Sequence, residues 1–89
     1  MPTLDIIIPA FNAAHCLDRT LRAIADQSIP PNLSFGTIVV NNGSTDDTAA
    51  VLDHWSSKSV RRVDYREVRS RSAALNAGVS ASTAEYVLL

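Results

Sequence analysis

Two runs of apolar, largely β-branched residues are each ended at once by residues that interrupt a strand. Residues 4–8 stop at Pro9, and residues 37–40 stop at the Asn-Asn-Gly sequence that begins at Asn41. Neither run alternates apolar with polar side chains, as a strand with one solvated face would. Uniformly apolar strands are typical of parallel sheets covered by helices on both faces. Residues 86–89 form a third run of this kind, so the sequence predicts a layered α/β fold.

The segment between the first two runs carries a helical pattern. In residues 13–27, Leu17, Leu21 and Ile24 recur three or four positions apart and form one apolar stripe. Asn12 stands where an N-cap residue is expected. We therefore predict the first helix over these residues.

A second helix is predicted to begin near Ser44. Its hydroxyl suits an N-cap, and Asp46 and Asp47 would fall in the first turn, where the helix dipole favours negative charge. We expect this helix to turn three side chains inward: Ala50, Val51 and Trp55. A third, alanine-rich helix is predicted over residues 72–82, with Leu75 and Val79 on its apolar face.

Between the second and third helices, residues 60–68 alternate imperfectly among charges, which favours a strand at the edge of the sheet. The resulting β-α-β-α-β-α-β order predicts a Rossmann-like three-layer sandwich with right-handed crossovers. We expect a parallel sheet in the spatial order 3-2-1-4, with the first and fourth strands adjacent at its centre.

Composition excludes several other classes of protein. Of the 89 residues, 46% are hydrophobic and 19% are charged, as in globular rather than disordered chains. The net charge of −1 argues against a nucleic-acid partner, although arginines gather between residues 61 and 71. Cys16 is the only cysteine, and no apolar run approaches the roughly 18 residues of a membrane span. We expect a cytoplasmic protein without a membrane span, either free or peripheral to the inner face of the membrane.

Two polar motifs follow the first two predicted strands. In open α/β sheets, ligands bind beyond the carboxyl ends of the strands. Residues 9–12 (PAFN) and 41–46 (NNGSTD) fall there, and both are candidate binding segments. Simpler interpretations exist for each: residues 41–43 can be a plain turn, Ser44 and Asp46 can be helix caps, and Phe11 can belong to the core.

Four motifs, in order and at similar spacing, resemble glycosyltransferase family 2. The family commonly shows I-P-x-[YF]-N, V-[DV]-[DN]-G-S-x-D, A-x-N-x-G and G-E-Y. This chain has IPAFN at residues 8–12, VVNNGSTD at 39–46, AALNAG at 73–78 and AEYV at 84–87. The resemblance covers essentially the whole chain, and it implies that residues 1–89 are the nucleotide-binding half of a GT-A domain.

The resemblance also implies a binding site for a nucleoside-diphosphate sugar such as a UDP-sugar. Carried over position by position, that site consists of Pro9, Ala10, Phe11, Asn12, Asn42, Gly43, Ser44 and Arg71. Asn42 would lie against the nucleobase, where many members carry Asp, so the base preference stays open. Arg71 would meet the diphosphate or the base, because the arginine that often precedes Asn76 in the family is replaced here by Leu75.

The implied reaction is sugar transfer to an acceptor hydroxyl with inversion at the anomeric carbon. In the family, Mg²⁺ or Mn²⁺ held by a D-x-D motif neutralises the leaving diphosphate, and a later carboxylate deprotonates the acceptor. Both would lie beyond Leu89, so we expect a truncated domain without catalytic residues or metal ligands, inactive alone, that self-associates through the exposed last strand.

Two other functions compete with this interpretation. A non-catalytic module that binds a nucleotide or another protein would keep the same motifs. A dinucleotide-binding dehydrogenase would need G-x-G-x-x-G after the first strand, and residues 9–13 contain no glycine. Other conspicuous side chains are given structural roles: His15 and His54 on helix surfaces, Trp55 in the core, and the arginines from 61 to 69 on a solvated edge-strand face.

Overall fold

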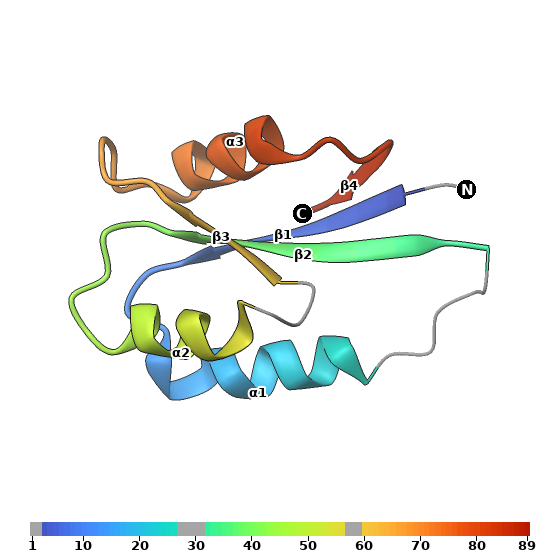
Figure 1. Ribbon diagram of the computed structural model, residues 1–89. Helices are drawn as coiled ribbons and strands as arrows, with labels where there is room; N and C mark the ends of the chain where they lie inside the picture. Colours follow the sequence, from blue (N-terminus) through green and yellow to red (C-terminus); the bar gives the residue numbers. More distant parts are fainter. Residues whose placement is uncertain (1–2, 27–31, 57–59) are drawn as a thin grey trace.

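The computed structural model describes residues 3–26, 32–56 and 60–89. The elements alternate along these ranges: β1 (Thr3–Ala10), α1 (Ala14–Ala25), β2 (Ser34–Asn41), α2 (Thr48–Trp55), β3 (Val60–Asp64), α3 (Arg71–Ala81) and β4 (Tyr86–Leu88). The strands form one sheet, parallel at every pairing, in the order β3-β2-β1-β4 (Figure 1). The predicted strand order and fold class are confirmed.

One detail of the sheet prediction is wrong. β1 and β4 are neighbours as expected, but β4 is an edge strand of the described sheet, paired only with β1. The central positions belong to β1 and β2, which are the two runs with the most continuous apolar sequence. β3 occupies the opposite edge, as its charges predicted.

Helices cover both faces of the sheet. α1 and α2 lie on one face and α3 lies on the other (Figure 1). Ile7, Ile38 and Val40 are buried under α3, whereas Val39 points to the side of α1 and α2. This division follows from the two-residue repeat of a strand, and each fully buried aliphatic side chain contributes roughly 1.5–3 kcal/mol.

Close packing against the sheet decides which face of α3 turns inward. Ala74 and Gly78 are buried, and a Cβ atom at Gly78 would collide with the side chain of Ile7. Leu75 is partly buried, but Val79 is 40% exposed, so its predicted place on the apolar face is wrong. Small residues fill this face because the helix backbone approaches the sheet too closely for a larger side chain.

The inward face of α2 also differs from the prediction. Thr48, Leu52 and Trp55 are buried, whereas Ala50 is exposed. Val51 is partly buried and packs on the same core. Trp55 is therefore a core residue, as expected.

Several element boundaries also shift. The first helix runs from Ala14 to Ala25, with Asp26 as its C-cap residue, so it is shorter than the predicted 13–27; residue 27 lies outside the described ranges. The second strand starts earlier than predicted, at Ser34. β3 ends at Asp64, so Tyr65 and Val68 are in the following loop. No helix in the described ranges has the length and apolar character needed to cross a membrane.

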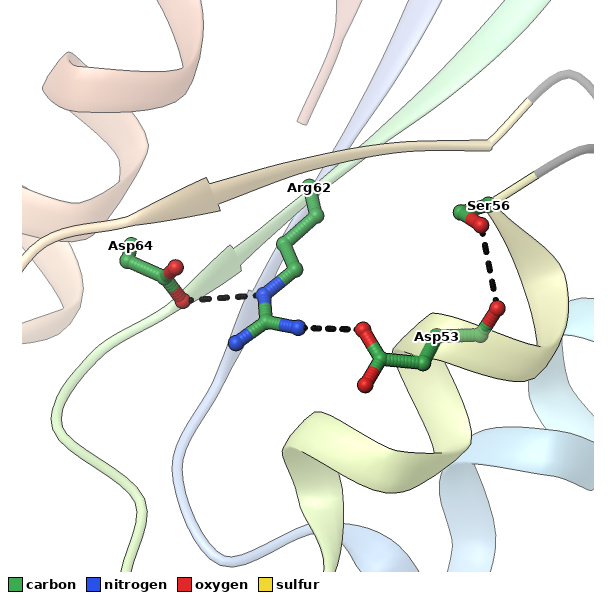
Figure 2. A network of polar contacts seen from close by, with 4 residues as sticks. All are labelled: Asp53, Ser56, Arg62 and Asp64. Atoms are coloured by element: carbon green, nitrogen blue, oxygen red, sulfur yellow. Dashed lines mark hydrogen bonds and ion pairs between the residues drawn. The ribbon is translucent and has the colours of Figure 1, made fainter.

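The arginines of β3 pair with groups on the protein surface. Figure 2 shows the guanidinium of Arg62 between the carboxylates of Asp53 and Asp64. The N–O distances of these two ion pairs are 2.6 Å and 3.1 Å. Arg61 donates a hydrogen bond to the carbonyl of Ala81 at 3.1 Å. Such exposed pairs contribute about 0–1 kcal/mol each. For Arg61 and Arg62, the expected solvated face of an edge strand is confirmed.

Candidate functional site

A pocket of about 270 Å³ opens beyond the carboxyl end of β1. Its lining comes from the end of β1, the residue after β2, and the junction of the β3–α3 loop with α3: Pro9, Ala10, Phe11, Asn42, Arg69, Ser70 and Arg71. Five of these, at positions 9, 10, 11, 42 and 71, are among the predicted site residues. The structure therefore brings them together at the sheet edge where ligands of open α/β folds bind.

Strand register explains this convergence. Ala10 pairs with Asn41 at the carboxyl ends of β1 and β2, and the backbone N–H of Asn42 donates to the carbonyl of Ala10 at 2.8 Å. Ser70 caps the N-terminus of α3 by accepting from the N–H of Ala73 at 3.0 Å. The capped helix begins at Arg71, so the positive end of its dipole also lies beside the pocket.

Arg69 is a pocket residue that the sequence interpretation missed. Its guanidinium carbon lies 4.2 Å from the centre of the Phe11 ring, a cation–π contact. Its assignment to the solvated face of an edge strand is wrong, because that strand has already ended at Asp64. The available signal was the distance along the chain: Arg69 immediately precedes the Ser70 cap and is two residues from Arg71.

Phe11 is 43% exposed. It therefore lies at the pocket rather than in the core, which decides between the two interpretations of this ring. One face of the ring carries the guanidinium of Arg69. An exposed aromatic ring beside two arginines is a surface on which a planar group can stack.

Asn42 is only 5% exposed although it lines the pocket. Its side-chain Nδ2 donates to the carbonyl of Tyr65 at 2.9 Å and to the carbonyl of Val68 at 3.0 Å. Both carbonyls belong to the β3–α3 loop. The asparagine thus joins the end of β2 to the loop that carries Arg69.

Asn12 and Ser44 join the two loops that follow β1 and β2. The Asn12 backbone has φ of 50°, and its Oδ1 accepts from the N–H groups of Thr45 at 2.8 Å and Asp46 at 3.2 Å. In return, the N–H of Asn12 donates to Ser44 Oγ at 2.9 Å. We call this set of reciprocal bonds between residues 12–14 and 44–48 the loop clasp.

The clasp corrects both predicted helix caps. Asn12 does not cap α1, which has Ala13 at its N-cap position, and Ser44 does not cap α2, which begins at Thr48 after Asp47. Both side chains serve the loop-to-loop bonds instead. Their predicted ligand contacts, and that of Gly43, stay predictions: these residues are outside the pocket lining, and Gly43 supplies the turn with φ of 76°.

Asp46 stabilises the N-termini of both helices on that face. One carboxylate oxygen accepts from the backbone N–H of Thr48 at 2.9 Å and from its hydroxyl, and the other accepts from the N–H of Ala14 at 3.2 Å. The hydrogen bond from the Thr48 hydroxyl is the largest cause that lowers the pKa of Asp46 below its ordinary value. Its role is that of a cap, although Asp46 and Asp47 precede the first turn of α2.

The described residues do not fit a divalent metal. Within those ranges, no group of three or more His, Cys, Asp or Glu side chains converges. Asp5 accepts from the hydroxyl of Ser82 at 2.6 Å, far along the sheet from Asp46 in the clasp. His15 and His54 are exposed on helices, as expected. We therefore derive no chemical step through a metal ion held by these residues.

Comparison with known proteins gives one family. Residues 5–89 match the sequence model of Glycosyl transferase family 2. Glycosyltransferase AglE of Haloferax volcanii is 28% identical over 85 residues, which is 93% of this chain and 28% of that protein.

Two solved structures have a similar fold. The mannosyltransferase PcManGT from Pyrobaculum calidifontis, in complex with GDP-Man and Mn²⁺, is 28% identical with a TM-score of 0.85, over 97% of this chain and 26% of that one. Residues 1–349 of S. aureus TarS, in complex with UDP-GlcNAc, are 22% identical with a TM-score of 0.82, over 99% of this chain and 25% of that one. The chain thus spans about a quarter of the length of these proteins.

Proposed function

The chain belongs to glycosyltransferase family 2, and we propose that it forms the donor-binding part of an enzyme that transfers a sugar from a nucleoside-diphosphate sugar to an acceptor hydroxyl with inversion. The observation that carries the proposal is the pocket beyond β1, where Pro9, Phe11, Asn42 and Arg71 converge. These residues come from three separate segments. Sequence motifs predicted Pro9, Phe11 and Asn42 for this role, and the family resemblance predicted Arg71 by its position.

The charge of the pocket suits a diphosphate. Of the residues that the structure describes, Arg69 and Arg71 line it and no acidic side chain does. Within the described ranges neither arginine forms an ion pair. Guanidinium groups that are not already paired are well matched to phosphate oxygens, and the N-terminus of α3 adds partial positive charge. We assign the diphosphate to Arg71 and the nucleobase to Phe11 and Asn42.

The size of the pocket indicates how much of the donor it would hold. At about 270 Å³ it is slightly below the roughly 300–1,000 Å³ of typical ligand sites. We therefore propose that this chain is the nucleotide-binding half of a GT-A domain and that the sugar, Mg²⁺ or Mn²⁺, and the catalytic base are held elsewhere in the protein. PcManGT in its Mn²⁺ complex supports a metal for the whole enzyme.

Alone, the chain would be inactive but would still bind a nucleoside diphosphate weakly. With half a pocket and no metal, a dissociation constant of about 1 mM, near −4 kcal/mol, is the expected order. The rival assignment, a non-catalytic nucleotide-binding or protein-interaction module, predicts the same binding, so the whole enzyme's transferase activity distinguishes them. A cytoplasmic location, free or at the inner face of the membrane, stays a prediction.

We also propose that the chain self-associates through β4. Tyr86, Leu88 and Leu89 are 61%, 55% and 63% exposed, and within the described sheet β4 has a strand neighbour on one side only. An apolar edge strand of this kind is a template for pairing with a second copy. The occupant we expect is β4 of another molecule, related by a two-fold axis.

The assignment of Arg71 to the diphosphate is tested by comparing two variants. Arg71→Gln should weaken UDP and GDP binding about threefold to tenfold while leaving the binding of uridine, which has no phosphate, unchanged. Arg61→Gln is the matched control, because Arg61 lies outside the pocket and contacts Ala81. Equal weakening by both variants would show that only the overall charge matters.

A further inference from the structure

Asn42 uses both of its amide hydrogens inside the protein. They are directed to the carbonyl oxygens of Tyr65 and Val68, at 2.9 Å and 3.0 Å. An amide has two donor hydrogens and one acceptor oxygen, so its donor capacity is filled by these two bonds. The reverse orientation of the amide would place Oδ1 against two carbonyl oxygens, which are acceptors only. The two partners therefore fix which atom faces which way.

Oδ1 is the atom left over. No side chain or backbone group of the described residues donates a hydrogen bond to it. In those ranges, every side-chain nitrogen or oxygen atom that is fully buried has a hydrogen-bond partner, so an atom without one is not fully buried. Oδ1 therefore keeps contact with the outside, although Asn42 as a whole is 5% exposed. Asn42 lines the pocket, so the pocket is where its side chain can meet a ligand.

The carbonyls held by Asn42 lie just before Arg69 in the chain. Val68 directly precedes it, and the guanidinium of Arg69 rests over the Phe11 ring at 4.2 Å. Tyr65 N–H also donates to the carbonyl of Asn41 at 3.0 Å. The end of β2 thus holds both ends of the segment 65–68. The Val68 carbonyl also accepts from the backbone N–H of Ser70 at 3.1 Å, so the amide of Asn42 anchors to β2 a short turn that has Arg69 at its centre.

From this arrangement we infer that Asn42 is the positioning residue for Arg69 and that it offers the ligand an acceptor only. The inference rests on the proposed function for its ligand. Its Oδ1 selects a base with an N–H on the edge facing the pocket, such as N3–H of uracil or N1–H of guanine. Its Nδ2 hydrogens hold the segment 65–68, which leads into Arg69.

Because Asn42 both donates through Nδ2 and accepts through Oδ1, aspartate is a poor replacement at position 42, although members of the family commonly carry it there. A carboxylate also accepts from a base N–H, but it has no hydrogen to give to the carbonyls of Tyr65 and Val68. Two carbonyl oxygens facing a buried carboxylate would repel it, and an unsatisfied buried acceptor is costly. The segment 65–68 would be released, and Arg69 would leave Phe11.

The preceding asparagine supplies a matched control. Asn41 is 4% exposed, nearly as buried as Asn42, but its Oδ1 accepts from the N–H of Ser44 at 3.2 Å. Asn41→Asp therefore keeps the recorded hydrogen bond, whereas Asn42→Asp loses two. Comparing the two variants separates the loss of donors from the general effect of a buried carboxylate.

The positioning role is tested without any ligand by NMR of the 89-residue chain. In the wild type, both side-chain amide protons of Asn42 should exchange slowly, and the ring signals of Phe11 should show contacts to Arg69. Asn42→Asp should abolish those contacts and lower the melting temperature by several degrees more than Asn41→Asp does. Fast exchange of the Asn42 amide protons, or unchanged Phe11–Arg69 contacts in Asn42→Asp, would overturn the inference.

The acceptor role is tested with blocked bases. UDP should bind at least fivefold more tightly than 3-methyluridine 5′-diphosphate, and GDP more tightly than 1-methylguanosine 5′-diphosphate. Asn42→Ala should remove that discrimination, because alanine has no acceptor for the base N–H. Equal binding of blocked and unblocked bases would refute the acceptor role while leaving the donor site intact. Absence of binding by UDP and GDP would instead refute the proposed function, and the ligand-free test would still decide the positioning role.

Discussion

Asn12 and Ser44, which are 32 positions apart in the chain, are joined by a hydrogen bond of 2.9 Å from the Asn12 N–H to Ser44 Oγ. In the other direction, Oδ1 of Asn12 accepts hydrogen bonds from the backbone N–H groups of Thr45 and Asp46. The loops after β1 and β2 are therefore held as one unit. Because β1 leads directly into this unit, the clasp also fixes the place of Phe11 beside the pocket.

Asn12→Ala should unfold more readily than the wild type by about 1–3 kcal/mol. Alanine cannot accept from the N–H groups of Thr45 and Asp46, and the backbone at position 12 has a positive φ of 50° that alanine tolerates poorly. Urea denaturation measures the change. Asn12→Asp is the control, because aspartate keeps the acceptor and tolerates this backbone conformation. Equal losses in the two variants would contradict the assigned role of Oδ1.

Asp46 should make stability depend on acid pH. Its pKa is lowered from the ordinary value of 3.8 in the folded state, so its contribution is fully present above that value. The contribution is then lost as pH falls through the lowered folded-state pKa. Melting temperatures between about pH 2 and 6 should fall less steeply in Asp46→Asn than in the wild type.

The control for Asp46 is its neighbour. Asp47 makes no side-chain capping bond, so Asp47→Asn should keep the wild-type acid dependence. Asp18 contributes to that dependence as well, since hydrogen bonds from Trp55 and Arg22 lower its pKa. Parallel acid curves for Asp46→Asn and the wild type would show that the clasp carboxylate does not contribute.

Gly78→Ala should destabilise the fold even though alanine favours helices. The new Cβ would collide with Ile7 and crowd Val40, and overpacking of this kind costs about 1–3 kcal/mol. The gain in helix propensity is at most about 1 kcal/mol. Ser80→Ala, at an exposed position of the same helix, should be neutral or slightly stabilising. Chemical denaturation that ranks the two variants in the opposite order would contradict the close packing of α3.

Self-association through β4 predicts a dimer or larger species in light scattering at about 100 μM, a concentration above many weak dimer dissociation constants. Leu88→Lys should shift the chain toward monomer, because a charge on the exposed edge opposes pairing with a second copy. A sharp monomer mass for the wild-type chain at that concentration would refute the proposal.

The sequence predicted the features that depend on runs of residues. The apolar runs at 4–8 and 37–40 and the charges near Arg62 predicted the strand order and the edge position of β3, although the fourth strand was wrongly placed at the centre. The ends of the first two strands then placed Phe11 and Asn42 near one another, because parallel strands end on the same side. Arg71, at the start of α3, was predicted from the family resemblance.

Features that depend on pairs of distant residues could not be predicted in this way. Asn12 and Ser44 both have side chains suited to capping a nearby helix. They bond across the two loops instead, because the loops lie side by side in the folded chain. The inward face of α3 was mistaken because a small residue, Gly78, gains its place through close approach rather than through hydrophobicity. Arg69 was missed because the length of the loop after β3 was not evident from the alternation of residues 60–68.

The central claim is that the pocket beyond β1 binds the nucleoside diphosphate of a sugar donor. Titration of the ¹⁵N-labelled chain with UDP and with GDP, each with and without Mg²⁺, tests it residue by residue. The account predicts saturable shifts of the backbone amides of Ala10, Phe11, Asn42 and Arg71, with a dissociation constant of about 1 mM that Mg²⁺ does not change. Shifts confined to β3 around Arg61 and Arg62, or a response that appears only with Mg²⁺, would contradict it.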